Sequence, residues 1–208
     1  MKSFSAACER NKEPILKILK KVLVSVQTVL EIGTGTGQHA LHFATAMPFI
    51  NWQTSDLSIN HDGINAWMSE ASLNNLREPI FLDVNMQEWP LRSVDAVFTA
   101  NTLHIMPWHS VEKMFKGVSN LFFNKGIFCV YGPFKYGGEH LSKSNALFDQ
   151  SIQVQYQGGG VRNYEDVVAV AAQFQLKLID EFEMPSNNRL LVFSKSTFDM
   201  RARALHVL

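Results

Sequence analysis

The chain has 208 residues, of which 46% are hydrophobic and 18% are charged, and its 19 Lys and Arg balance its 19 Asp and Glu. This length and composition predict one globular domain over residues 1–208 and exclude a disordered or low-complexity chain. A net charge of zero disfavours non-specific binding to nucleic acid or to an acidic membrane surface.

The cysteine count indicates the compartment. Cys8 and Cys129 are too few for a disulfide framework, so we expect a reducing, cytoplasmic setting. The first ten residues hold no apolar run of signal-peptide length, and no segment approaches the ~18 apolar residues of a membrane helix. A soluble, uncleaved protein is therefore expected.

Apolar spacing predicts alternating helices and strands over the first two thirds of the chain. An amphipathic helix over residues 13–24 comes first, with Pro14 in its first turn. The strands that follow are expected at 28–32, 51–55, 79–82, 94–100 and 126–131, and the helices at 38–46, 64–73 and 108–122. This alternation predicts a parallel sheet that is covered by helices on both faces.

The last third changes character. A helix is predicted over residues 164–174, followed by strands over 176–182 and 189–194 that a turn joins into a hairpin. The hairpin puts one antiparallel strand into the sheet, and residues 195–208 are expected to fray. Alternating units that end in a hairpin are similar to the Rossmann-like class I methyltransferase fold, an α/β fold with a seven-stranded, mostly parallel sheet.

A long connection separates the two parts of the chain. Residues 132–163 contain several glycines and a predicted short helix over 143–155. Connections longer than ~12–15 residues usually carry function or structure of their own. Two interpretations stay open: a lid or substrate wall at the strand ends, or a surface insertion.

The most informative motif is the glycine-rich turn at residues 33–37, between a buried strand and a helix. Such a turn lets the backbone approach a nucleotide-like cofactor closely, and it also matches the looser dinucleotide fingerprint. Glu31 would repel a pyrophosphate but suits the ammonium and sulfonium of S-adenosylmethionine. No Lys or Arg lies between Val22 and Asn75, so nothing local would neutralise a phosphate. The other interpretation is a plain strand-to-helix turn.

Two further acids follow neighbouring strands. Asp56 comes after the second strand, where a carboxylate could accept ribose hydroxyls, or simply cap a turn. Asp83 comes after the third strand and could accept a hydrogen bond from an adenine amine, or be a solvated turn residue. Acids without bases at successive strand ends favour a cationic cofactor.

Side chains near the fourth and fifth strand ends could carry chemistry. His104 is the natural base for a neutral methyl acceptor, but could equally be a hydrogen-bonded wall residue. Tyr131 could orient an acceptor hydroxyl or pack in the core, and Trp108 could stack on a planar substrate or seal a helix start. Arg162 could bind an acidic group of the substrate, or pair with Glu165 or Asp166.

Distinctive motifs run along nearly the whole chain: residues 9–16 (ERNKEPIL), 35–40 (GTGQHA), 52–56 (WQTSD), 82–84 (LDV), 131–134 (YGPF) and 160–163 (GVRN), with Asn101, His104, Pro107 and Trp108 between them. These motifs resemble the methyltransferase-like family known as domain of unknown function 938. The resemblance implies a class I fold and S-adenosylmethionine binding, but no substrate. The run Gly158–Gly160 departs from the family, whose members often carry a large aromatic residue there.

Site roles follow from these patterns and from the resemblance. The residues assigned to the cofactor are Glu31, Gly33, Thr34, Gly35, Gly37, Gln38, His39, Asp56, Leu57, Asp83, Val84 and Asn101. Those assigned to the substrate are Arg10, Asn11, Trp108, Phe134 and Arg162, and those assigned to catalysis are His104 and Tyr131. Asn11 could instead cap the first helix. The histidines show no metal-ligand spacing, so no metal site is expected.

The leading hypothesis is an S-adenosylmethionine-dependent methyltransferase that acts on a small-molecule acceptor. A second is an NAD-dependent oxidoreductase, which would use the same glycine turn but shows no Tyr-x-x-x-Lys signature. A third is a non-catalytic S-adenosylmethionine-binding protein. The oligomeric state is not predicted.

Overall fold

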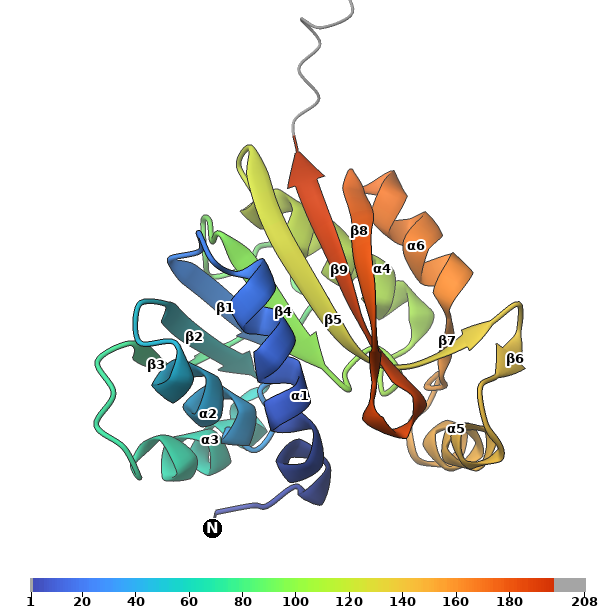
Figure 1. Cartoon of the computed structure of the whole chain (residues 1–208), viewed down its shortest axis with the longest axis horizontal. Coiled ribbons are helices and arrows are strands. Elements are labelled where there is room, and N and C mark those ends of the chain that lie inside the picture. Colours follow the sequence, from blue (N-terminus) through green and yellow to red (C-terminus); the bar gives the residue numbers. More distant parts are fainter. Residues whose placement is uncertain (1, 197–208) are drawn as a thin grey trace, which may run out of the picture.

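A mostly parallel sheet forms the centre of the computed structural model, which describes residues 2–196 (Figure 1). Its strands lie in the order β3-β2-β1-β4-β5-β9-β8, and only β9 runs antiparallel to the others. Their bounds are β1 Thr28–Ile32, β2 Asn51–Asp56, β3 Leu76–Phe81, β4 Ala96–Ala100, β5 Lys125–Tyr136, β8 Leu176–Met184 and β9 Asn188–Ser196. The predicted fold class, including its single antiparallel strand, is confirmed.

Helices cover both faces of this sheet. Their bounds are α1 Ala6–Val22, α2 Gln38–Ala46, α3 His61–Met68, α4 Trp108–Leu121, α5 Lys143–Gln155 and α6 Tyr164–Gln173. Side chains of β1 alternate between the two cores: Val29 packs with α1 and α2, whereas Leu30 and Ile32 pack with α4 and α6. Burial on both sides explains why the central strands β1, β4 and β5 are mostly apolar, whereas β2 and the edge strand β3 carry more polar residues.

The first helix begins at Ala6, so the predicted start at residue 13 is wrong. The hydroxyl of Ser5 accepts a hydrogen bond from the backbone N–H of Cys8 and caps the helix. Arg10 and Asn11 therefore lie inside the helix, and Asn11 is not its cap. The first two turns hold almost no large apolar residue, so the apolar periodicity becomes visible only from Ile15 onward.

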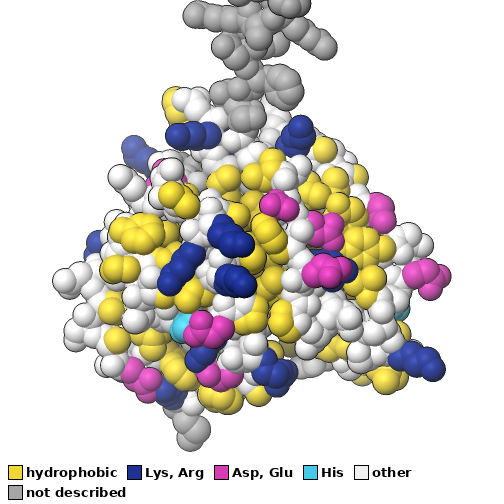
Figure 2. All heavy atoms as spheres, in the orientation of Figure 1, with side chains coloured by type: hydrophobic (Ala, Val, Ile, Leu, Met, Phe, Trp, Pro, Cys, Tyr) yellow, Lys and Arg dark blue, Asp and Glu magenta, His cyan; other side chains and the backbone are white. Residues whose placement is uncertain are grey.

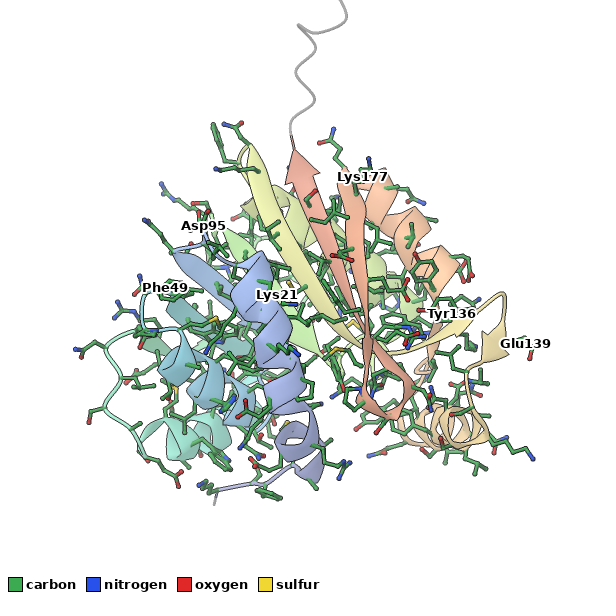
Figure 3. All side chains as sticks on the ribbon, viewed as in Figure 1. Lys21, Phe49, Asp95, Tyr136, Glu139 and Lys177 are labelled. Atoms are coloured by element: carbon green, nitrogen blue, oxygen red, sulfur yellow. The ribbon has the colours of Figure 1, made fainter. Side chains whose placement is uncertain are left out.

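The connection at 132–163 has structure of its own. Strand β5 continues to Tyr136 and pairs with two short strands, β6 (Glu139–His140) and β7 (Arg162–Asn163). The predicted helix at 143–155 is confirmed as α5. Tyr136 and Glu139 lie at the edge of the molecule remote from α1 and α2 (Figure 3), where Tyr136 stacks on Tyr164 at 4.9 Å between ring centroids.

The remaining differences concern element ends. Strand β3 starts at Leu76, earlier than predicted, and tolerates Pro79 because it is an edge strand. Helix α3 starts and ends earlier than the predicted 64–73. The predicted fraying from residue 195 is wrong for residues 195 and 196, which belong to β9 and pair with β5, and residues 197–208 lie outside the described residues.

The surface matches the balanced composition. On the face seen in Figure 2, acidic and basic side chains are interspersed with hydrophobic ones. Among residues 2–196, no helix combines the length and the apolar character that are needed to cross a membrane.

Asn75 generates a stability prediction, because its side-chain amide donates to the carbonyls of Ala44 and Ile50, each at 2.9 Å, and of Met47 at 3.3 Å. Asn75→Ala should lower the free energy of unfolding by about 1–3 kcal/mol, since these carbonyls lose their donor. The matched control is Asn74→Ala, at the exposed neighbouring position, which should change it by less than about 0.5 kcal/mol. Urea unfolding measures both, and equal effects would contradict the assignment.

Candidate active site

The glycine-rich turn is held by the end of β2. The backbone N–H groups of Gly33 and Thr34 donate to the carbonyl of Ser55 at 3.0 and 3.1 Å, and that of Gly35 donates to Asp56 Oδ2 at 2.7 Å. Gly33 and Gly35 have φ angles of +71° and +64°, a region that favours glycine. The sequence therefore needs glycine here for the backbone conformation itself.

Two of the glycines also allow close approach. A Cβ atom on Gly33 would lie 2.9 Å from Thr102 Oγ1, at the end of β4. One on Gly37 would lie 3.1 Å from the backbone of Ile64 in α3. Gly33 thus lets β1 meet β4, and Gly37 lets α2 pack on α3.

A cavity of about 620 Å³ lies over this turn at the carboxyl ends of β1, β2 and β4. Of the predicted cofactor residues, it is lined by Gly33, Thr34, Gly35, His39, Asp56, Leu57, Asp83, Val84 and Asn101. The structure therefore brings most of the predicted cofactor site together. Glu31, Gly37 and Gln38 do not line it.

The two aspartates of the cavity retain acceptor capacity. Asp56 Oδ1 accepts from the N–H of Leu57 and from the side chain of Asn60, both at 2.7 Å, and Oδ2 accepts from Gly35. A carboxylate offers about four acceptor positions, so about one stays open toward the cavity. Asp83 Oδ1 accepts twice from Asn85, at 2.8 and 3.0 Å, through its backbone and side chain.

The charge of the cavity is negative. Its lining within the described residues includes Asp56 and Asp83 but no Lys or Arg. The N–H groups of Gly33, Thr34 and Gly35 already bond to the protein, so they form no free cradle for a phosphate. The site favours a ligand with neutral or cationic groups over a pyrophosphate.

Glu31 is buried beneath the cavity. Its Oε2 accepts a hydrogen bond from the indole N–H of Trp52 at 2.8 Å, and both side chains belong to the α1 and α2 side of the sheet. Burial, with a smaller contribution from the charge of Asp56, raises the pKa of Glu31 to about 8. Because Glu31 does not line the cavity, its predicted contact with the cofactor stays a prediction.

Gln38 holds the start of the chain over the cavity. Its side-chain oxygen accepts from the N–H of Ser5 at 2.6 Å, and its amide donates to the Ser5 carbonyl at 3.3 Å and to Glu9 at 3.1 Å. Trp67 of α3 donates to the carbonyl of Ser3 at 2.6 Å. Residues 2–5 thus form a strap between α2 and α3, and Ser5 and Cys8 join the cavity wall.

His39 is oriented by the first helix. Its Nε2 lies 2.6 Å from Asn11 Oδ1, an atom that can only accept, so Nε2 carries the hydrogen and Nδ1 faces Cys8 Sγ at 3.9 Å. Burial lowers the pKa of His39 to about 4, which keeps the ring neutral. Asn11, predicted to contact substrate, is buried and serves here to orient a cavity residue.

The predicted catalytic side chains lie next to the cavity wall. His104 packs edge-on against Phe148 of α5, with 5.3 Å between ring centroids. Burial, and then the charge of Arg162, lower its pKa to about 4. The hydroxyl of Tyr131 accepts from Asn188 at 3.0 Å, and burial raises the pKa of Tyr131. Neither residue lines the cavity, although Ile105, next to His104, does.

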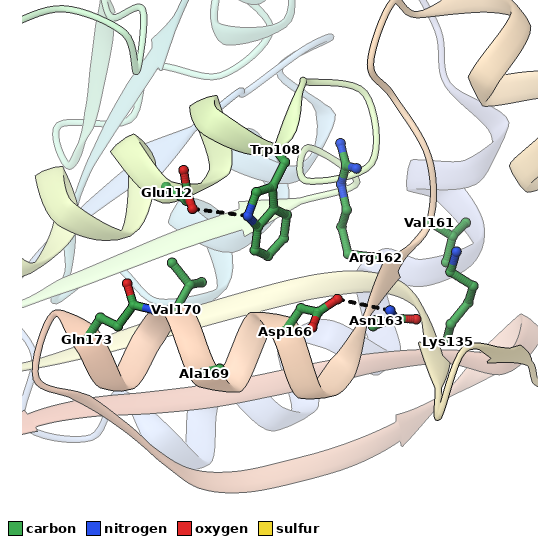
Figure 4. Close-up of a pocket in the computed structure, with 10 residues that line it drawn as sticks. All are labelled: Trp108, Glu112, Lys135, Val161, Arg162, Asn163, Asp166, Ala169, Val170 and Gln173. Atoms are coloured by element: carbon green, nitrogen blue, oxygen red, sulfur yellow. Dashed lines mark hydrogen bonds between the residues drawn. The ribbon is translucent and has the colours of Figure 1, made fainter.

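The predicted substrate residues do not line one common cavity. Trp108 and Arg162 line a separate cavity of about 510 Å³ between α4 and α6, where they lie side by side (Figure 4). Phe134 is buried in the core, because it points to the α4 and α6 side of β5. Arg10 is exposed on α1.

The predicted pairing of Arg162 with Glu165 or Asp166 is wrong in this structure, whereas its binding to an acidic group of the substrate stays a prediction. Its guanidinium donates to the backbone carbonyls of Leu103, Met106 and Gly158 rather than to an acidic side chain. Its planar set of donors satisfies loop carbonyls that no secondary structure pairs. No local sequence pattern around Arg162 predicts this tertiary role.

Sequence reasoning missed several residues of the cavity wall: Ser5, Cys8, Asn60, Asn85, Thr102, Ile105, His109, Ser110 and Tyr156. Asn60 could have been found, because a side-chain donor four residues after Asp56 is well placed to bond it. Ser5 and Tyr156 come from distant segments, so no local pattern could have indicated them.

Comparison with known proteins agrees with this geometry. The family model "Protein of unknown function (DUF938)" matches residues 2–195. Similar solved structures include an O-methyltransferase family protein from Burkholderia thailandensis, with a TM-score of 0.80, 15% identity and coverage of 90% of this chain and 57% of that one. Human N-acetylserotonin methyltransferase in complex with SAM gives a TM-score of 0.78 and 14% identity, covering 92% and 53%.

A third similar structure is an O-methyltransferase family 2 protein from Planctomyces limnophilus in complex with apigenin, with a TM-score of 0.77, 14% identity and coverage of 89% and 56%. The chain thus spans little more than half the length of these neighbours. At this identity the likeness shows the fold.

Gly33 and Gly35 form a matched pair for mutation. Gly35→Ala should cost about 1–2 kcal/mol of stability from its positive φ alone, because its Cβ meets nothing nearer than 4.0 Å. Gly33→Ala adds the clash with Thr102 and should cost clearly more. Thermal unfolding of both variants measures the difference, and equal losses would refute the close approach of β1 and β4.

Glu31 generates a pH prediction. Its folded pKa of about 8 lies above the ordinary 4.5, so its contribution to stability is full below pH 4.5 and is lost as the pH rises to about 8. Glu31→Gln keeps an acceptor for Trp52 but cannot ionise. Relative to the wild type, the free energy of unfolding of the variant should increase across this window by at most about 1.4 kcal/mol per pH unit. A difference in the free energy of unfolding between variant and wild type that stays constant from pH 5 to 8 would disprove the raised pKa of Glu31.

Proposed function

The chain belongs to the DUF938 family, and we propose that it is an S-adenosylmethionine-dependent methyltransferase that acts on a small-molecule acceptor. The observation that carries this proposal is the cavity over the glycine turn, which has acidic acceptors and no cation in its described lining. Its fold, shared with methyltransferases, supports the same reaction class.

The cavity residues fit the chemical groups of this donor. Asp56 offers its open acceptor position to a ribose hydroxyl, and Asp83 offers its second oxygen to an adenine amine. Gly33 and Gly35 line the cavity without side chains. His39 lines the cavity as a neutral ring, so it adds no positive charge beside the ammonium end of the donor. When bound, S-adenosylmethionine supplies a methyl group activated by its sulfonium.

We assign His104 as the base that takes the proton of the acceptor. A pKa of about 4 keeps the ring neutral and able to accept a proton, but it also makes the imidazole a weak base, because a general base works best with a pKa near the operating pH. Phe148 of α5 packs edge-on against the imidazole. Tyr131, whose raised pKa keeps it protonated, orients the acceptor as a hydrogen-bond donor.

A small-molecule acceptor agrees with two observations. The balanced surface charge gives no long-range attraction to a polyanion. The inserted residues 132–163 put α5 close to His104, which narrows the space beside the cavity. In addition, a neighbour of the same fold is described in complex with apigenin.

Calorimetry with S-adenosylhomocysteine and with NAD tests the cofactor assignment. S-adenosylhomocysteine should bind at least about tenfold more tightly than NAD, because the pyrophosphate meets two carboxylates and no cation. Asp83→Asn should narrow this preference, since it removes one of the two charges. Tighter binding of NAD would overturn the proposal.

His104→Gln tests the base. Transfer of a labelled methyl group to small molecules of a cell extract should fall by about 100-fold or more, while S-adenosylhomocysteine affinity stays within about twofold. His42→Gln, whose ring pairs with Glu13 of α1 and does not line the cavity, is the control that should retain transfer. Full activity of His104→Gln would remove this residue from the mechanism.

A further inference from the structure

The segment Gly158–Arg162 is bonded to the loop that carries His104. The N–H of Gly160 donates to the His104 carbonyl at 2.8 Å. Arg162 Nε donates to the Leu103 carbonyl at 3.0 Å, and its Nη2 donates to Gly158 at 2.9 Å and also to Met106. One guanidinium therefore joins both ends of the loop turn to the segment that precedes β7.

The glycine run makes this contact possible. A Cβ on Gly159 would lie 3.0 Å from the carbonyl oxygen of His104 and 2.9 Å from Tyr156 Cβ. One on Gly158, whose φ is +74°, would lie 2.9 Å from Pro107 Cβ. The run that departs from the family pattern is thus the surface on which residues 104–107 rest.

The segment is also bonded to α5 and β5, which belong to the same long connection. Asp149 of α5, only 3% exposed, accepts from the N–H of Val161 at 2.7 Å. His140 lies 3.1 Å from the same carboxylate, and Lys135 lies 3.7 Å from it. Because β7 also pairs with β5, the segment has a fixed position from which to hold the loop.

We propose that Arg162 is a positioning residue, which holds the 103–106 loop by joining the carbonyls of Leu103 and Met106 to that of Gly158 and so fixes both His104 and the cavity wall at Ile105 and Met106. The role in the reaction rests on the proposed function. The set of hydrogen bonds from Arg162 to the three carbonyls, called the clamp below, does not. Trp108, whose ring centroid lies 5.9 Å from the Arg162 guanidinium carbon, covers its other side (Figure 4).

The charges around His104 make its pKa sensitive to the position of the Arg162 guanidinium. Arg162 lowers the pKa of His104, and Asp149 opposes it with a smaller effect, while Lys135 and His140 face Asp149 from β5 and β6. Moving or removing the guanidinium therefore changes both the mobility of the loop and the titration of its histidine.

The test is hydrogen exchange of the full chain without any ligand. Arg162→Gln and Arg162→Lys should both speed exchange in peptides covering residues 101–108 and 158–161 by about tenfold, and leave β4 and β5 unchanged. Lys fails to rescue because one ammonium cannot span three separated carbonyls. Arg92→Gln, at an exposed position before β4, is the control and should match the wild type.

Gly159→Ala provides an independent variant that keeps the arginine. Its added Cβ should push the loop away and speed exchange in the same peptides. NMR titration gives a second readout, in which the pKa of His104 should rise from about 4 in Arg162→Gln but stay below its ordinary 6.5, because burial, the largest cause of the shift, remains. His104→Gln identifies the signal.

Three results would overturn the clamp: wild-type exchange in both arginine variants, rescue by Lys, or acceleration spread evenly over the sheet. If Arg162→Gln does not fold, Arg162→Lys and Gly159→Ala decide. None of these readouts requires methyl transfer or a bound cofactor, so failure of the clamp is distinguishable from failure of the proposed function.

Discussion

The hydrogen bond from the Gly35 N–H to Asp56 is the constraint on which the site depends. It joins the turn after β1 to the end of β2, and the same carboxylate holds Leu57 and Asn60 at the opposite wall. Without it, the N–H of Gly35 would be free to bind an anion. With it, that N–H is satisfied by the protein, and the Asp56 carboxylate gives the floor of the cavity a negative charge.

This arrangement determines which ligands the cavity accepts. A carboxylate fixed at the turn and another at Asp83 favour hydroxyl, amine and cationic groups, and they repel phosphate. Two further segments complete the enclosure: residues 2–5 bond to Gln38 of α2 and Trp67 of α3, and Arg162 bonds to the loop that carries His104. The strand ends supply the floor of the cavity, while the N-terminal segment and the loop after β4 supply parts of its walls.

Much of this could be predicted from local patterns. Strand β1, helix α2 and helix α5 were located at their observed bounds, because apolar runs and glycine positions are local signals. The roles of Gln38 and Arg162 could not be predicted, since their partners lie 33 and 56–59 residues away in sequence. The start of α1 was missed because its capping serine precedes turns without large apolar residues.

The most direct measurement is a crystal structure with S-adenosylhomocysteine. The account predicts a ribose hydroxyl within hydrogen-bond distance of Asp56, the adenine amine at Asp83, and the amino-acid end near His39. A ligand seated between α4 and α6 beside Trp108, or a ribose bound away from Asp56, would contradict it.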